Sequence, residues 1–211
     1  MNKSRIARIL GTLLLLIGLA GLYVVGGLRG LPYLGWFSHH VPILLGLALI
    51  LRSRFLLTAE IAIGFIPESL WTIDLLGHLL TGSFPFGVTS YLFNPLEPMP
   101  VVWWAYSHLL IVPSMILGLW LLGGASRYGA LGSLVHAAFL YFVPVLFITP
   151  DYNVNCVVLS CIENYVPTTS AYALEWWVVI VGMIALVSAF LMLFATPRHE
   201  LPHKKRSALG W

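Results

Sequence analysis

Apolar runs of roughly 20 residues, the length of helix that crosses about 30 Å of hydrocarbon, recur along the whole chain. Of the 211 residues, 59% are hydrophobic and 9% are charged, whereas soluble domains have about 45–50% apolar and about 25% charged residues. This composition indicates an integral membrane protein. We predict an all-α, six-helix transmembrane bundle that forms one membrane domain over residues 1–211, with helices at about 7–27, 37–51, 55–81, 101–122, 127–149 and 171–195.

Basic residues predict the orientation, because short cytoplasmic loops are enriched in Lys and Arg. Every Lys and Arg except Arg29 falls near a terminus or in the joints at 52–54 and 123–128. We therefore expect a cell-membrane protein with both termini in the cytoplasm and with the loops 82–100 and 150–170 facing outward. The net charge of +3 then reflects these topogenic residues, and no basic and aromatic pattern indicates nucleic-acid binding.

Residues 55–81 carry acidic side chains inside an apolar span. A helix that enters from the cytoplasmic side at Phe55, with a rise of about 1.5 Å per residue, places Glu68 near the membrane midplane. Asp74 and His78 would lie ~9 Å and ~15 Å farther outward and share one face of the helix. Because a charged Asp at this depth costs about 2.5–3.5 kcal/mol on insertion scales, we expect these groups to have partners.

Residues of the other spans reach similar depths. Those expected in the outer half are His39 or His40, His108 and Glu175. His136 would lie slightly inside the midplane, where we interpret it as a packing histidine. Glu60 would lie near the inner interface, within reach of Arg52 or Arg54.

No Lys or Arg lies in the membrane core near the acids, so protons, histidinium or a metal ion must compensate their charge. Three interpretations fit this cluster: an enzyme site, a proton or ion path, or a structural set of interhelical hydrogen bonds. In the metal version, zinc or another divalent ion would activate water, with Glu68 as the proton acceptor. The predicted ligands are His40, His78, His108 and Asp74, with Asp74 either binding the metal or orienting His78.

Two short motifs carry a family resemblance. The segments YSHLLIV at 106–112 and PDYNVNC at 150–156 resemble the YwaF-like family of small integral membrane proteins, which looks related to a transmembrane phospholipid acyltransferase. This resemblance implies that His108 and Cys156 are catalytic and that an acyl group is transferred through a thioester. The acids of residues 55–81 depart from that pattern. Cys161 could also lock Cys156 in a disulfide, since both lie in an outward loop.

The ligand types and depths are also similar to those of the alkaline ceramidase superfamily. Those helical bundles hold zinc with three His and one Asp and cleave lipid amides. Both resemblances imply a membrane lipid as substrate, and we expect Trp71, Trp104 and Glu175 to contact it. The sequence therefore predicts an intramembrane lipid hydrolase or acyltransferase with its site in the outer half of the bilayer. The alternatives are a proton-coupled transporter or channel and a non-catalytic protein with a structural polar cluster.

Overall fold

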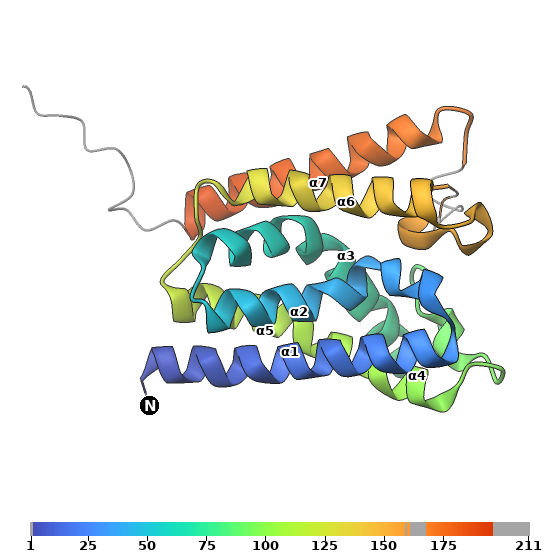
Figure 1. Ribbon diagram of the computed structural model, residues 1–211, viewed down its shortest axis with the longest axis horizontal. Coiled ribbons are helices and arrows are strands. Elements are labelled where there is room, and N and C mark those ends of the chain that lie inside the picture. The colour runs from blue at the N-terminus through green and yellow to red at the C-terminus, as the bar shows by residue number, and fades with distance from the viewer. Residues whose placement is uncertain (1, 159, 161–167, 196–211) are drawn as a thin grey trace, which may run out of the picture.

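The computed structural model describes residues 2–158, 160 and 168–195, and the regular structure in this part of the chain is helical. Long helices run roughly antiparallel to one another, and the start of α1 lies at the same end of the bundle as the end of α7 (Figure 1). The α-helices are α1 (Lys3–Leu28), α2 (Phe37–Ile50), α3 (Arg54–Thr81), α4 (Met99–Ala105), α5 (Ile111–Leu122), α6 (Gly129–Phe147) and α7 (Tyr172–Phe194). Short 3-10 helices are η1 (Leu31–Gly35), η2 (Ser90–Phe93), η3 (Tyr106–Leu110), η4 (Pro150–Tyr152) and η5 (Val154–Cys156).

The six predicted helical segments are all present, with ends close to the predicted boundaries. Five of them are long and apolar enough to cross a membrane, namely Lys3–Leu28, Arg54–Thr81, Met99–Leu122, Gly129–Phe147 and Tyr172–Phe194. The sixth, α2, is an apolar helix of 14 residues. The chain is therefore an all-helical protein with the features of a multi-pass membrane protein.

The segment predicted at 101–122 is interrupted by the 3-10 helix η3, which joins α4 to α5. Pro113 follows closely and has no backbone N–H to donate to the carbonyl of Leu109, which favours a change of helical geometry just before it. The interruption places His108 in η3, with its side chain buried against α3.

Helix α3 occupies the centre of the bundle and contacts α2, α5, α6 and α7 (Figure 1). Its buried face includes Leu57, Ile61 and Leu75. Helix α1 lies outside this group and packs against α2, α4 and α5. The polar side chains of α3 therefore meet residues from several other helices.

Two glycines bring α1 and α2 close together. A β-carbon on Gly46 would lie 2.7 Å from the carbonyl oxygen of Gly11. The reverse distance, from a β-carbon on Gly11 to the oxygen of Gly46, is also 2.7 Å. Small residues of this kind let helix backbones approach closely in membranes.

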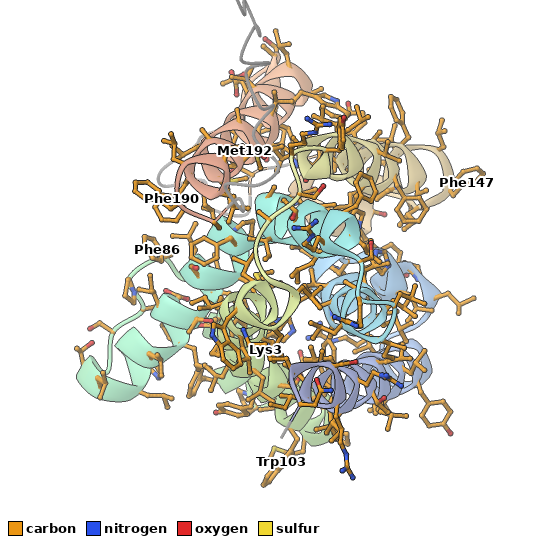
Figure 2. The ribbon with its side chains drawn as sticks, turned by 90° about the vertical axis from the view of Figure 1, so that its left-hand side faces the viewer. Lys3, Phe86, Trp103, Phe147, Phe190 and Met192 are labelled. Carbon is orange, nitrogen blue, oxygen red and sulfur yellow. The ribbon has the colours of Figure 1, made fainter. Side chains whose placement is uncertain are left out.

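The outer surface of the bundle is apolar. Trp103, Phe147 and Phe190 point away from the helices (Figure 2) and have exposed fractions of 72%, 80% and 59%. A soluble monomer rarely exposes contiguous apolar surface on this scale. The exterior thus fits a hydrocarbon environment.

Candidate functional site

The three acids of α3 are all buried, and each has a different set of partners. Exposed fractions are 1% for Glu60, 2% for Glu68 and 0% for Asp74. The expectation that buried acids would be partnered is therefore met. Glu68 and Asp74, however, do not meet His78 and His108 at the one common site that the sequence predicted for these four residues.

Asp74 anchors the loop that follows α3. One carboxylate oxygen accepts hydrogen bonds from the backbone N–H groups of Phe86, at 2.6 Å, and Gly87, at 2.9 Å. The other accepts from the backbone N–H of Thr89, at 2.8 Å, and from its hydroxyl, at 2.7 Å. Four donors occupy both oxygens, so this carboxylate holds the loop in place and is not available as a catalytic base or a metal ligand.

His78 belongs to an aromatic cluster in the same region. Its ring stacks on Phe84 with ring centroids 3.8 Å apart and meets Phe93 at 4.2 Å. It therefore does not pair with Asp74, although the two are four residues apart on one helix face.

The predicted metal site is not assembled. Among the described residues, no group of three or more His, Cys, Asp and Glu side chains could hold a metal ion. The four predicted ligands instead have separate environments: Asp74 binds loop amides, His78 stacks on Phe84, His108 faces Glu68, and His40 donates to a backbone carbonyl.

Glu68 and His108 form a closed pair. Oε2 of Glu68 lies 3.1 Å from Nδ1 of His108, and both side chains are 3% exposed. Trp71 stacks on the imidazole at 4.6 Å between ring centroids, and Trp104 meets it edge-on at 5.2 Å. The indole of Trp104 also donates to the carbonyl of Ile17 at 3.1 Å. The two tryptophans predicted to contact substrate thus enclose this histidine.

Glu60 and His136 form a second pair, which sequence reasoning missed. Oε1 of Glu60 lies 3.0 Å from Nδ1 of His136, and the two side chains are 2% and 10% exposed. The predicted pairing of Glu60 with Arg52 or Arg54 is therefore replaced by an interhelical contact between α3 and α6. The remaining polar atoms of the pair, Oε2 of Glu60 and Nε2 of His136, are buried and have no hydrogen-bond partner.

This second pair lines a groove of about 630 Å³. Residues of α2, α3 and α6 line it. Apart from Glu60, His136 and His40, the lining is apolar. Its α6 wall reaches the outer surface, where Val135 is 69% exposed and Phe139 is 50% exposed. The groove is therefore an apolar space with one acid–histidine pair and an opening on the side of the bundle.

His40 stands beside the pair at the end of the groove. Its Nε2–H donates to the carbonyl oxygen of Leu34 at 2.9 Å, since a carbonyl oxygen only accepts. Its ring stacks toward that of His136 at 6.2 Å between centroids and contacts Phe139 at 5.8 Å. Of the predicted site residues, His40 is the one that lines this groove.

The remaining predicted site residues lie elsewhere. Cys156 is disulfide-bonded, so it is not the free nucleophile that acyl transfer through a thioester needs. The only other cysteine of the sequence is Cys161, which lies outside the described residues. Glu175 accepts a hydrogen bond from the hydroxyl of Thr169 at 2.7 Å, at the start of α7. It thus stabilises a helix end and is not part of either acid–histidine pair.

The unpartnered atoms of Glu60 and His136 define what the site can do. An uncompensated charge is costly in an apolar space, so the pair is expected to be net neutral, as carboxylate with imidazolium or as carboxylic acid with imidazole. In each form Oε2 and Nε2 together offer one hydrogen-bond donor and one acceptor. Such a pair can bind a polar group and move a proton to and from it.

A scan against protein-family models and searches of curated proteins and of solved structures give no match to the chain. The two family resemblances therefore stay predictions. The function has to be inferred from the site itself.

Proposed function

We propose that this protein is an intramembrane enzyme that hydrolyses or transfers the acyl group of a lipid, with Glu60 and His136 as its acid–base pair. The observation that carries the proposal is that Glu60 and His136 line an apolar groove open to the side of the bundle, while Oε2 of Glu60 and Nε2 of His136 have no hydrogen-bond partner. The pocket volume and apolar lining are in the range of small-molecule sites. Oε2 of Glu60 and Nε2 of His136 make no hydrogen bond that would give them a structural role.

We further propose six membrane crossings, with α2 as the shortest, and both termini in the cytoplasm of a cell membrane. The alternating directions of the helices (Figure 1) and the placement of all Lys and Arg residues except Arg29 support this topology. Under it, Glu60 lies ~9 Å along α3 from the cytoplasmic end. The site would then lie in the inner half of the bilayer, not in the outer half as the sequence predicted.

The chemistry follows from the two free atoms. Oε2 of Glu60 accepts a proton from water while the water oxygen forms a bond to the acyl carbon. Nε2–H of His136 donates a proton to the leaving oxygen as the carbon–oxygen bond breaks. A water molecule then carries the proton from Glu60 to His136. One ester and one water give one acid and one alcohol, and an alcohol in place of water would give acyl transfer.

The test is lipid turnover by the purified protein in nanodiscs, with products identified by mass spectrometry. Glu60→Gln and His136→Gln should each reduce turnover by about 100-fold or more, the lower end of what acid–base groups contribute. The matched controls Glu175→Gln and His78→Gln should stay near the unaltered protein. Turnover that survives in both site variants, or that is absent for every ester and amide lipid offered, would rule the proposal out.

A second candidate, a proton path, is favoured by the repetition of the acid–histidine pair along α3. Glu60 and Glu68 lie about 12 Å apart along the helix axis. His40 stacks beside His136, and His39 lies 4.8 Å from the Trp104 ring that also contacts His108. In proteoliposomes with a pH-sensitive dye inside, this candidate predicts proton flux that both Glu60→Gln and Glu68→Gln abolish. Lipid turnover without flux would reject it.

A further inference from the structure

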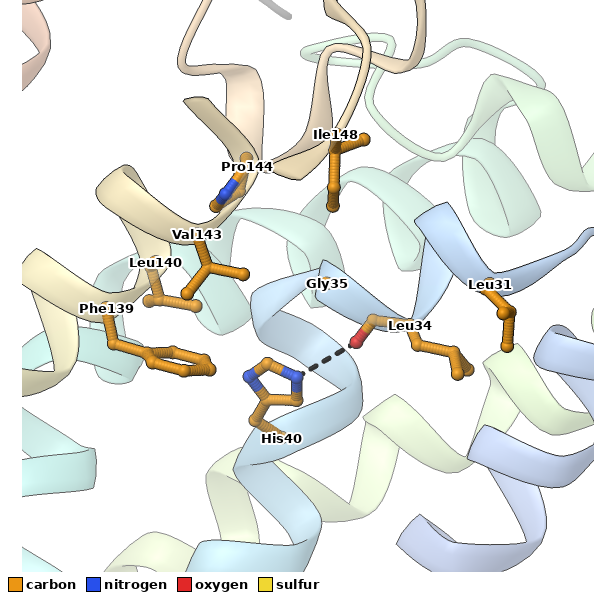
Figure 3. A pocket seen from close by; sticks show the side chains of 9 residues that line it. All are labelled: Leu31, Leu34, Gly35, His40, Phe139, Leu140, Val143, Pro144 and Ile148. Atoms are coloured by element: carbon orange, nitrogen blue, oxygen red, sulfur yellow. Dashed lines mark hydrogen bonds between the residues drawn. The ribbon is translucent and has the colours of Figure 1, made fainter. Parts of the chain in front are cut away.

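A second cavity continues the groove along α6. It has a volume of about 250 Å³ and is lined by residues of η1, α2 and α6 and by Ile148 (Figure 3). His40 and Phe139 line both cavities. In Figure 3 the His40 ring lies between Phe139 and the carbonyl of Leu34, to which it is hydrogen-bonded. These two rings therefore separate two adjoining apolar spaces.

One face of α6 runs along both cavities. Leu131, Val135, Phe139 and Val143 recur every four residues, so they share a face of the helix. From Leu131 to Ile148 this track is ~26 Å long. His136 lies within the track, with apolar lining on both sides of it.

Asn155 of η5 joins two residues that line the small cavity. Its side-chain N–H group donates to the carbonyls of Gly35, at 2.9 Å, and Leu140, at 3.1 Å. Both of these residues line the small cavity. The track thus has a larger part, which Glu60 and His136 line, and a smaller part next to it, with the rings of His40 and Phe139 between the two.

The lining also limits the charge of a ligand. Among the described residues that line the two cavities, none is Lys or Arg. A phosphate group in the track would lack the cationic partner that buried anions need. The free donor of the Glu60–His136 pair can instead bind an uncharged carbonyl oxygen, and the free acceptor is left for the attacking water.

We infer that the ligand is a neutral lipid whose carbonyl group joins two hydrocarbon segments, a longer one in the groove and a shorter one in the small cavity. The inference rests on the proposed function for the position of the reactive group and adds the substrate class. A long-chain fatty ester of a hydrophobic alcohol has this form. A phospholipid, whose ester lies next to a charged headgroup, does not.

Ketones test the ligand without any turnover, because they carry the carbonyl but cannot be hydrolysed. The probes are tritiated heptyl pentadecyl ketone, with two hydrocarbon segments, and methyl pentadecyl ketone, with one. Binding is measured on purified protein in nanodiscs. The first ketone should bind about tenfold tighter, since filling a pocket by even one further methylene group is worth tenfold or more.

Val143→Trp should remove this difference by filling the small cavity, while methyl pentadecyl ketone still binds and so reports that the variant is folded. Val145→Trp is the matched control, because Val145 is on the same helix turn and 47% exposed. It should keep the tenfold preference. Equal binding of the two ketones to the unaltered protein, an unchanged preference in Val143→Trp, or displacement of the ketone by dialkyl-ether phosphatidylcholine at equal concentration would overturn the inference.

The two proposals can fail separately. Ketone selectivity without turnover of any ester would leave the neutral-lipid site standing and remove the enzyme. Ester turnover that depends on Glu60, without ketone selectivity, would keep the enzyme and remove the assignment of two hydrocarbon segments.

Discussion

Glu68 of α3 faces His108 of η3 at 3.1 Å in the closed interior, whereas the similar pair of Glu60 and His136 borders an open groove. The difference lies in what surrounds each imidazole. Trp71 and Trp104 cover the ring of His108, while Nε2 of His136 has no hydrogen-bond partner. We therefore assign a structural role to the pair at Glu68 and a chemical role to the pair at Glu60.

The first prediction concerns stability. Glu68→Ala should lower the free energy of unfolding by about 3–5 kcal/mol, because removal of one member of a buried pair leaves the other without a partner. A thermal melt in detergent would report this as a large fall in apparent Tm. Ketone binding at 4 °C, below the melt, should stay near that of the unaltered protein.

The matched control is a double substitution. Glu68→Leu with His108→Leu replaces both polar groups by apolar ones and should be markedly more stable than Glu68→Ala. A double variant as unstable as the sum of the single variants would mean that the two residues do not act as a pair.

Hydropathy predicted the helices well, because the length of an apolar run and its flanking polar residues decide where a membrane helix begins and ends. Hydropathy alone did not predict the break inside 101–122, although Pro113 is a sequence signal for a change of helical geometry there. It also did not predict the close approach of α1 and α2 at Gly11 and Gly46, because only packed backbones distinguish a contact glycine from a free one such as Gly27.

The site was harder to predict, because a depth calculation ignores the rotation of each helix and the course of the loops. Asp74 was placed near histidines, yet the chain folds the backbone of Phe86 to Thr89 onto it. The helix starts also matter. Counted from the starts of α3 and α6 in the structure, Glu60 and His136 both lie ~9–11 Å from the same end of the bundle, whereas the predicted starts at 55 and 127 place them ~7.5 Å and ~13.5 Å from it.

The second prediction concerns the loop that follows α3. Asp74→Ala removes the acceptor for four hydrogen bonds, each worth about 1.5–3 kcal/mol when the acceptor is charged. Chymotrypsin added to the purified protein should then cut after Phe86 or Tyr91 at least about tenfold faster, since a loss of little more than 1 kcal/mol already gives that factor.

Asp151→Ala is its control, because Asp151 is an exposed acid in η4. It should leave the cleavage rate unchanged. Equal protection of the loop in Asp74→Ala would contradict the anchoring role, and loss of ketone binding in a variant whose apparent Tm is normal would return Asp74 to the list of site residues.

The third prediction tests the glycine contact between α1 and α2. Gly46→Ala places a methyl group 2.7 Å from the carbonyl oxygen of Gly11 and from the backbone nitrogen of Leu15. Because backbone atoms cannot move aside as a side chain does, we expect a destabilisation of about 1–3 kcal/mol. Gly27→Ala in α1, where nothing lies within 4 Å, should be neutral or slightly stabilising. Similar melting of the two variants in detergent would contradict the close packing.

The fourth prediction concerns Cys156. Because it is disulfide-bonded, maleimide should modify it only after reduction, which intact-mass measurements before and after reductant would detect. Disulfides persist on the oxidising side of a membrane, so protection in freshly isolated membranes would also support an outward position of the loop that follows α6. Ready labelling without reductant would show a free thiol and reopen the thioester route, in which case Cys156→Ser should abolish acyl transfer while leaving ketone binding at the Glu60–His136 groove intact.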